Sequence, residues 1–438
     1  GARTALFNYL FARHHGGEFK LRIEDTDLAR NSDAAYQAIV DGLKWLGLTF
    51  DGEIVYQRLN AERHREVAKE LVKRGSAYYC YTTAEELAEQ RAAAEAKGEV
   101  FKYDRKWRDS AVTPPAGVKP SIRIKAPLDS NVIVKDAVQG EVTFGPDALD
   151  DMVILRSDGN PTYNLAVVVD DHDMGVTHVI RGDDHLNNAG RQSLIYQAMG
   201  WEIPTFAHIP LIHGPDGAKL SKRHGATSTT EYANMGYLPE AMRNYLARLG
   251  WSHGDSEIFS DAEAIQWFGL DHVGQSPSRL DFAKLNHVNA HHMRAKPAEE
   301  LAALLDVPVS MAAAIESVKP KASTLLELKE ALQFYLSAPT SYDEKAKAAL
   351  EKGKSALADA IPLLETLNDW SADSLKQQIA AIAEKLGKKL GEVMPPMRAA
   401  LVGAMSGPDV PVAMAILGRD EVLKRFKAAL SALDFAAT

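Results

Sequence analysis

The pattern of apolar residues changes along this chain, and the change limits the folds open to it. In the first half, helical and strand patterns alternate. An i,i+4 apolar stripe over 2–15 precedes the alternating stretch 19–23, and the strand pattern of 177–181 precedes a helix that ends at Met199. Asn187 or Asn188 is expected to cap that helix. After Gly225 the patterns are helical to the end of the chain. The sequence therefore predicts an open α/β sheet followed by an all-α region.

Amphipathic helices are expected on both sides of this change. In the first half they cover 33–46, 61–75 and 84–97. In the second half they cover 239–250, 298–305, 311–318, 323–337, 342–366, 371–387 and 411–434. Pro239 and Gly250 stand where these residues are favoured, in the first turn of a helix and just past its end. A further strand is expected at 152–156, and 165–169 is a buried apolar run.

Length and composition place bounds on function. A chain of 438 residues is expected to hold two to four domains. Its net charge of −9 argues against a protein that coats nucleic acid indiscriminately, so RNA contacts must use local patches. The single cysteine, Cys80, excludes an internal disulfide and argues against a thiolate zinc site. Without a signal peptide or a run of about 18 apolar residues, a cytoplasmic protein with no membrane span is expected.

A basic loop gives the strongest indication of chemistry. The stretch 219–225 reads KLSKRHG, and it follows the apolar run 209–212 and the turn residues 214–217. Lys219 and Lys222 suit a polyphosphate, because an ammonium group is a compact cation that can follow a phosphate as charge develops on it. Short motifs match by chance often, and on its own this loop is more typical of a solvated basic turn.

Polar side chains follow two of the predicted strands, at the end where open α/β sheets bind their ligands. Glu24 comes directly after the first of these strands. Arg181 ends the strand of 177–181, and Asp184 and His185 follow it. The acidic stretch that begins at Glu24 has a second interpretation, as the N-terminal cap of the next helix. Glu24 is the better functional candidate because it is the first residue after its strand.

Residues 100–150 differ in composition and in apolar pattern from the segments around them. They combine prolines with short alternating stretches such as 121–125, which indicates an inserted α+β module. Phe101, Tyr103 and Trp107 are interleaved with basic residues. This composition suits the binding of RNA ends, and it suits equally well a solvated surface over buried aromatic side chains.

Together these segments resemble the bacterial glutamyl-tRNA synthetases, which are class I aminoacyl-tRNA synthetases. The similarity runs from Gly1 to the C-terminus and follows several motifs in fixed order. Gly1–Asn8 is similar to the helix after that family's H-I-G-H signature, and Leu21–Asp27 to its L-R-I-E-D-T-D segment. The remaining matches are Pro161–Asn164, Val168–Asp171, His178–Gly182 and, for the K-M-S-K-S loop, Lys219–Arg223.

The resemblance implies a reaction and a set of site residues. Glutamate would attack the α-phosphorus of ATP to give glutamyl-adenylate, and the glutamyl group would pass to the terminal ribose of tRNA. ATP, accompanied by Mg²⁺, would be bound by Gly1, Ala2, Asp184, His185, Leu211, Ile212, Lys219, Ser221 and Lys222. Of these, Lys219 and Lys222 would be catalytic. Glutamate would be bound by Glu24, Tyr163 and Arg181.

The resemblance also divides the chain into segments. A Rossmann-like catalytic domain would occupy 1–62 and 151–187, interrupted at 63–150 by an inserted module that binds the acceptor end of tRNA. Residues 188–300 would contact the tRNA stem and carry the K-x-S-K loop, and 301–438 would form a helical anticodon-binding region. The implied partners are tRNA(Glu) and L-glutamate, and the protein is expected to be a monomer.

The sequence departs from the family pattern in three places, of which the first two concern its start and its inserted module. It begins at what would be the fourth position of H-I-G-H, so we expect a fragment of a longer gene product rather than a damaged enzyme. Relatives with zinc in the inserted module use several cysteines, whereas Thr82 and Trp107 accompany Cys80 here. No structural zinc is therefore expected. Capping or surface roles, rather than a metal site, are expected for His172, Asp173, Asp183 and His185.

Gln333 bears on which tRNA is charged. Relatives that accept only the glutamate tRNA have Arg at this place, in the helix that resembles the anticodon-contacting one. The third anticodon base is C for glutamate and G for glutamine. Arg only donates and suits the carbonyl of cytosine, whereas Gln both donates and accepts. We therefore expect an enzyme that also charges tRNA(Gln), unless Gln333 is a surface residue without RNA contact.

Three competing functions are weighed against this interpretation. Glutaminyl-tRNA synthetases end in β-barrels, unlike the helical end of this chain. The short relative that glutamylates a modified tRNA base lacks the anticodon half that 301–438 supply. A catalytically impaired paralogue that only binds tRNA is the alternative from a different functional class. ATP–pyrophosphate exchange with and without tRNA separates that binder from an enzyme.

Overall fold

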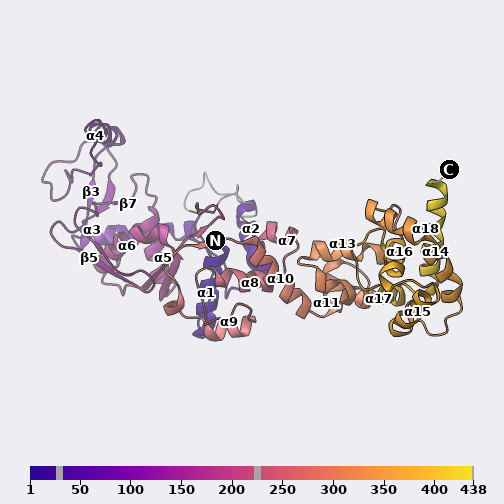
Figure 1. The fold of residues 1–438 in the computed structure, drawn as a ribbon. Coiled ribbons are helices and arrows are strands. Elements are labelled where there is room, and N and C mark those ends of the chain that lie inside the picture. Colours follow the sequence, from indigo (N-terminus) through magenta and orange to yellow (C-terminus); the bar gives the residue numbers. More distant parts are fainter. Residues whose placement is uncertain (26–32, 221–227, 437–438) are drawn as a thin grey trace. The chain divides into compact units, whose positions relative to one another are not determined.

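A computed structural model describes residues 1–25, 33–220 and 228–436. Asp27 and the loop residues Ser221 to Gly225 lie outside these ranges. The described chain forms two compact units, one from 1–231 and 243–281, and one from 232–242 and 282–438 (Figure 1). The first is the mixed α/β unit, and the second is the helical unit.

The α/β unit contains short strands and helices in alternation. Its strands are β1 Arg22–Ile23, β2 Val55–Tyr56, β3 Ala77–Cys80, β4 Ser121–Ile124, β5 Val132–Asp136, β6 Gly140–Phe144, β7 Val153–Leu155, β8 His178–Gly182, β9 Thr205–Ile209, β10 Ile212–His213 and β11 Ser278–Arg279. Its helices are α1 Ala2–His14, α2 Asp33–Trp45, α3 Ala61–Lys73, α4 Ala84–Ala96, α5 Tyr163–Asp173, α6 Leu186–Met199 and α9 Asp261–Trp267. The unit boundary falls within α7 Thr229–Asn234 and α8 Pro239–Arg248.

The strands form four small sheets rather than one. The largest has the order β6-β5-β9-β8, in which β8 and β9 are parallel and β5 and β6 form an antiparallel hairpin. The hairpin comes from the segment expected to be the inserted module, and β5 joins β9 in parallel through Asp136 and Phe206. Helix α6 connects β8 to β9, which is the crossover that a parallel pair needs.

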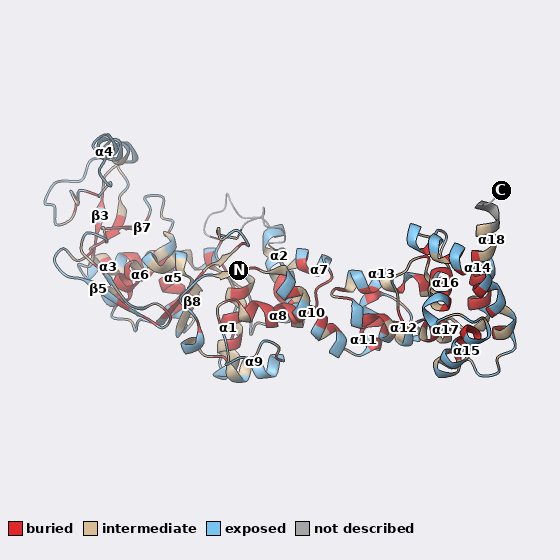
Figure 2. Ribbon diagram, in the orientation of Figure 1, coloured by how far each residue is buried: buried red, intermediate tan, exposed pale blue. Residues whose placement is uncertain are grey.

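Helix α5 explains the buried apolar run at 165–169. Five consecutive residues from Leu165 to Val169 are buried, and Asp170 and Asp171 after them are also buried. A short apolar run fits a buried strand and a buried helix equally well, so sequence periodicity did not decide between them. The helix packs in the main core of this unit with α3, α6 and β9, which is the buried interior visible around α5 in Figure 2.

The helical unit follows the predicted pattern with three differences, the first of which is a helix at 282–295 that was not predicted. Its helices are α10 Phe282–Ala295, α11 Ala298–Leu305, α12 Ala312–Val318, α13 Leu325–Leu336, α14 Glu344–Glu365, α15 Ala372–Lys385, α16 Leu390–Val402, α17 Val410–Leu417 and α18 Arg419–Ala436. The single helix expected at 411–434 is two helices, because Gly418 takes a positive φ of 79° between them. Helix α16 was not predicted, since Pro395 and Pro396 lie inside it.

Two further expectations were wrong. Not every segment after Gly225 is helical, because β11 pairs in parallel with β10 through Ser278 and Ile212. Neither Asn187 nor Asn188 caps α6. The capping residue is His185, and the Asn188 amide instead lies 3.2 Å from its Nδ1.

Candidate active site

The candidate site lies at the carboxyl end of β8. Helix α1 packs beside this strand, where Nδ2 of Asn8 donates to the carbonyl of Ile180 over 2.9 Å. After Arg181 and Gly182 the chain turns through the short helix Asp183–His185 and enters α6. One strand end therefore presents a guanidinium, a carboxylate and an imidazole within five residues. This is the edge at which parallel sheets bind their ligands.

The structure brings together the three residues predicted to bind glutamate, which we call the carboxylate side of the site. Glu24, Tyr163 and Arg181 interact electrostatically with one another. Burial lowers the pKa of Arg181 below its usual value, and nearby Tyr163, Asp171 and Glu24 act against that shift. Tyr163 is 36% exposed, so the group is reachable from solvent on that side.

A buried ion pair lies next to the carboxylate side and contacts Glu24. Nη1 of Arg22 lies 2.8 Å from Oδ1 of Asp171, and its Nη2 lies 3.4 Å from Oε1 of Glu24. Burial raises the pKa of Asp171, although Arg22 pulls it down. Arg22 thus holds Glu24 and Asp171 in place. Arg22 belongs to the L-R-I-E-D-T-D segment, but the sequence analysis did not predict this role.

Asp25, the neighbour of Glu24, is a structural residue. Its side chain is 1% exposed, and it accepts hydrogen bonds from the backbone N–H and the Nε of Arg58 at 2.8 and 2.7 Å. Asp25 therefore ties β1 to the segment after β2 rather than pointing at a ligand.

The structure also brings together the described residues predicted to bind the nucleotide, which we call the phosphate side. A Cβ at Gly182 would lie 2.6 Å from Oδ1 of Asp184 and 3.2 Å from Cδ2 of Leu211, so these residues converge at that glycine. Nζ of Lys219 lies 3.4 Å from Oδ2 of Asp184. His185 also reaches the carboxylate side, because its Nδ1 lies 3.4 Å from the hydroxyl of Tyr163.

The start of α1 reaches the same place through Arg3. The buried Arg3 guanidinium donates to the carbonyl of Pro210, and over 2.8 Å to the carbonyl of Leu249. Pro210 directly precedes Leu211 and Ile212. Gly1 and Ala2 therefore lie at the phosphate side. Sequence reasoning missed Arg3, whose partners lie more than 200 residues away.

Two buried residues behind Arg181 were also missed. Nε of Arg181 donates to Nε2 of His208 over 3.0 Å, and Nδ1 of His208 lies 2.5 Å from Oδ2 of Asp136. The ring of Phe206 lies under the guanidinium, with its centroid 5.5 Å from Cζ. The sequence signals for this pair are weak. They are a histidine in an apolar strand and an aspartate at the end of another strand, 72 positions earlier.

Cys80 lies in a hydrogen-bonded cluster. Its sulfur lies 3.1 Å from the hydroxyl of Tyr103 and accepts from Nε of Arg123 over 3.3 Å. Thr82 also contacts Tyr103, at 3.2 Å. Within the described ranges, no group of three or more His, Cys, Asp or Glu side chains is arranged to hold a metal ion. The absence of structural zinc stays a prediction.

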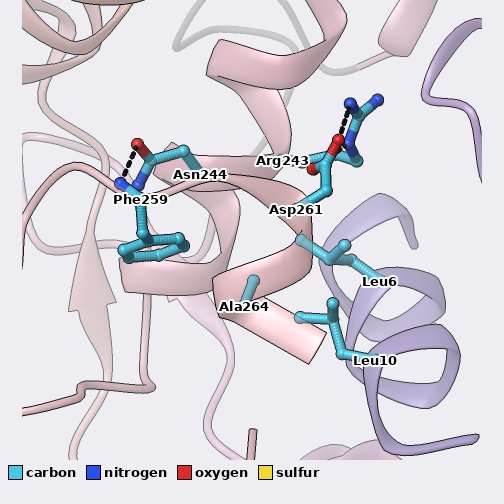
Figure 3. A pocket seen from close by; sticks show the side chains of 7 residues that line it. All are labelled: Leu6, Leu10, Arg243, Asn244, Phe259, Asp261 and Ala264. Atoms are coloured by element: carbon cyan, nitrogen blue, oxygen red, sulfur yellow. Dashed lines mark hydrogen bonds and ion pairs between the residues drawn. The ribbon is translucent and has the colours of Figure 1, made fainter. Parts of the chain in front are cut away.

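A small cavity elsewhere in this unit is not a ligand site. It lies between Leu6 and Leu10 of α1 and Ala264 of α9, beside the ion pair of Arg243 and Asp261 (Figure 3). Its volume of about 10 Å³ is at the lower limit for a single water molecule. The cavity is a packing void lined by none of the candidate site residues.

The family models match nearly the whole chain. Residues 1–287 match "tRNA synthetases class I (E and Q), catalytic domain", and residues 285–430 match "Anticodon binding domain". The chain belongs to the class I tRNA synthetases. The expected architecture, a class I catalytic domain followed by a helical anticodon-binding region, is confirmed.

Individual relatives agree with this assignment. The chain is 51% identical to glutamate–tRNA ligase 2 of Parvibaculum lavamentivorans, over 98% of this chain and 91% of that protein. It is 52% identical to glutamate–tRNA ligase 1 of Methylobacterium radiotolerans, over 97% and 94%. The crystal structure of a glutamate tRNA ligase from Elizabethkingia meningosepticum matches with a TM-score of 0.89 and 34% identity, over 98% and 95% of the two chains. The resemblance to bacterial glutamyl-tRNA synthetases is confirmed.

Two further observations concern partners. Gln333 lies on α13 with its side chain exposed, within the stretch that matches the anticodon-binding model. Among the helices of the described chain, none has the length and apolar character needed to cross a bilayer.

Proposed function

We propose that this protein ligates L-glutamate to the 3′ end of tRNA(Glu) through a glutamyl-adenylate, with ATP and Mg²⁺ entering together as substrate. The observation that carries the proposal is that one strand end places Arg181 beside Asp184 and His185. A carboxylate grip and a nucleotide-binding edge are thereby adjacent, as adenylate formation requires. The glutamate–tRNA ligases that match at 51–52% identity support the choice of glutamate.

The chemistry needs no covalent enzyme intermediate. An oxygen of the glutamate α-carboxylate attacks the α-phosphorus of ATP, and the bond to pyrophosphate breaks. A hydroxyl of the terminal ribose of tRNA then attacks the activated carbonyl and releases AMP. Arg181 and Tyr163 hold substrate carboxylate, Glu24 accepts from the ammonium group, and Lys219, Ser221 and Lys222 stabilise charge on the departing pyrophosphate. Positioning and electrostatics carry the rate.

ATP–pyrophosphate exchange tests this proposal in the full-length protein. The assay is run with glutamate alone and with glutamate plus tRNA(Glu), because glutamate activation commonly needs tRNA in this family. We expect exchange that depends on both glutamate and tRNA. Tight tRNA binding without exchange under either condition would instead identify a tRNA-binding paralogue.

We further propose that the enzyme is non-discriminating and also charges tRNA(Gln). The support is the exposed position of Gln333 on α13, where a side chain is free to face an anticodon base. A glutamine amide both donates and accepts, so it fits the edges of cytosine and guanine, whereas an arginine only donates. Another enzyme would then amidate the glutamate attached to tRNA(Gln).

Charging of both purified tRNAs by wild type and Gln333→Arg tests tRNA choice. We expect wild type to charge both, and the variant to lose about 10- to 100-fold in kcat/KM for tRNA(Gln) only, because a base contact contributes roughly 1–3 kcal/mol of discrimination. Lys329→Gln on the exposed face of the same helix is a control for general surface effects. A wild type that ignores tRNA(Gln) would refute the proposal. A Gln333→Arg variant that still charges both would remove position 333 from the explanation.

A further inference from the structure

Arg181 is joined to a buried aspartate–histidine pair that lies outside the predicted site. Its Nε donates to Nε2 of His208, and the side chains of His208 and Asp136 are completely buried. We propose that His208 and Asp136 are positioning residues, which orient the guanidinium of Arg181 so that its terminal nitrogens face the substrate carboxylate. This inference rests on the proposed function, because it concerns the binding of glutamate.

The hydrogen-bond pattern fixes the protons of His208. A guanidinium has donors only, so Nε2 of His208 must be the acceptor in its contact with Arg181. Nδ1 then carries the proton of the neutral ring and donates to Asp136 over 2.5 Å. An imidazolium, or the other tautomer, would set an N–H of His208 against the Nε–H of Arg181. The pair therefore works in one protonation state and one tautomer.

Asp136 is itself held rigidly. Its Oδ1 accepts from the backbone N–H groups of Val138, Gln139 and His208 at 2.9 to 3.1 Å. The side chain of Gln139 in turn donates to the carbonyl of His208 over 2.9 Å. Burial acts to raise the pKa of Asp136, but these hydrogen bonds, that from the His208 ring foremost, hold it below its usual value. The carboxylate that orients His208 thus has no freedom to rotate.

A neutral imidazole between the Asp136 carboxylate and the Arg181 guanidinium has an electrostatic advantage. A carboxylate in direct contact with Arg181 would neutralise the guanidinium and weaken its attraction for a substrate carboxylate. His208 transmits the orientation without supplying a negative charge. His208 occupies Nε and the ring of Phe206 lies beneath the guanidinium, while Nη2 makes a long contact of 3.5 Å with the carbonyl of His185. The terminal nitrogens thus face the site, where a substrate carboxylate can take an end-on, bidentate grip.

The chain contains a matched pair that serves as a control. Nε2 of His64 lies 2.8 Å from Oδ1 of Asp170, and both side chains are as deeply buried as those of the first pair. The Asp170 carboxylate also accepts from Gln57 and Asn60, at 2.9 and 3.1 Å. This second pair binds α3 to α5, and its hydrogen bonds run to these residues rather than to Arg181. Disrupting either pair is therefore expected to destabilise the fold by a similar amount. Only the first pair has a hydrogen bond to Arg181.

Three variants of the full-length protein test the proposal. His208→Phe keeps a ring and removes the acceptor, and Asp136→Asn keeps the shape but turns a donor toward Nδ1, which forces the wrong tautomer. For both, we expect the KM for glutamate to rise about 10- to 100-fold, since a hydrogen bond to a charged group is lost. The KM for ATP should stay within about twofold. His208→Gln offers Arg181 an amide oxygen, and it should recover part of the loss.

The control is His64→Phe, which should lower the melting temperature as His208→Phe does while leaving the KM for glutamate unchanged. Unchanged KM values for glutamate in both His208→Phe and Asp136→Asn would overturn the inference. So would equal rises for glutamate and ATP, or a matching rise in His64→Phe, because each indicates only a structural role. If His208→Phe does not fold, Asp136→Asn and His208→Gln decide the question. A wild type that neither binds nor activates glutamate would overturn the proposed function, and this inference with it.

Discussion

The two sides of the candidate site are built differently. On the carboxylate side, Arg181 is partly buried and its Nε is committed to His208. On the phosphate side, the side chains of Lys219 and Asp184 are 65% and 43% exposed and meet at 3.4 Å. A small carboxylate of fixed shape is recognised best by donors that are already in place. A triphosphate that changes charge and geometry during the reaction needs cations on longer, freer side chains.

The largest effect is expected for the lysine loop that is predicted to bind the triphosphate. Replacing Lys222 by Ala should slow adenylate formation about 100- to 1,000-fold, because loss of one positioned charge costs roughly 3–4 kcal/mol of transition-state stabilisation. Single-turnover kinetics of the full-length protein measure this rate. The Kd for tRNA should stay within about twofold. Wild-type rates in the variant would remove this loop from the catalytic assignment.

On the carboxylate side the expected loss is in binding. An Arg181→Lys variant keeps the charge but has a single nitrogen, which cannot serve His208 and a bidentate grip together. We expect the KM for glutamate to rise about 10- to 100-fold, with little change in the KM for ATP. Steady-state exchange assays with each substrate varied provide the comparison. An equal loss for ATP would mean that the two sides are not separately built.

Acid should remove a stabilising contribution of the buried carboxylate of Asp136. The folded pKa of Asp136 is held below its unfolded value of about 3.8. Its contribution to stability is therefore complete above that value and is lost as pH falls through the folded pKa. Urea unfolding at pH 7 and pH 3 should show a smaller acid loss in Asp136→Asn than in wild type. An equal loss of unfolding free energy in the two proteins would argue against a lowered pKa of Asp136.

The smallest effect is expected for the exposed pair. Asp184→Asn should change the free energy of unfolding by less than about 1 kcal/mol, because an exposed ion pair is weakened by water and salt. The urea midpoint measures this change, and added salt should reduce it further. A destabilisation comparable to that of Asp136→Asn would show that the phosphate side is as rigid as the carboxylate side.

The features that could be predicted from the sequence are those that depend on residues close together in the chain. The position of Arg181 and Asp184 at one strand end was predicted correctly, because short-range periodicity is a reliable guide to where a strand ends. His208 and Asp136 could not be paired, since a residue's partner across a sheet depends on strand order. Helix α16 was missed because prolines argue against a helix in any local analysis, although Gly353 of α14 allows Pro396 to approach closely.

The β5–β6 hairpin has a consequence for shortening this protein. Since β5 lies between β6 and β9, deleting the whole segment 63–150 would turn β9 into an unprotected edge strand, with free backbone groups that invite aggregation. A deletion confined to α4 and the loop up to residue 119 would leave that sheet complete. A minimal version of this protein must therefore keep residues 132–144.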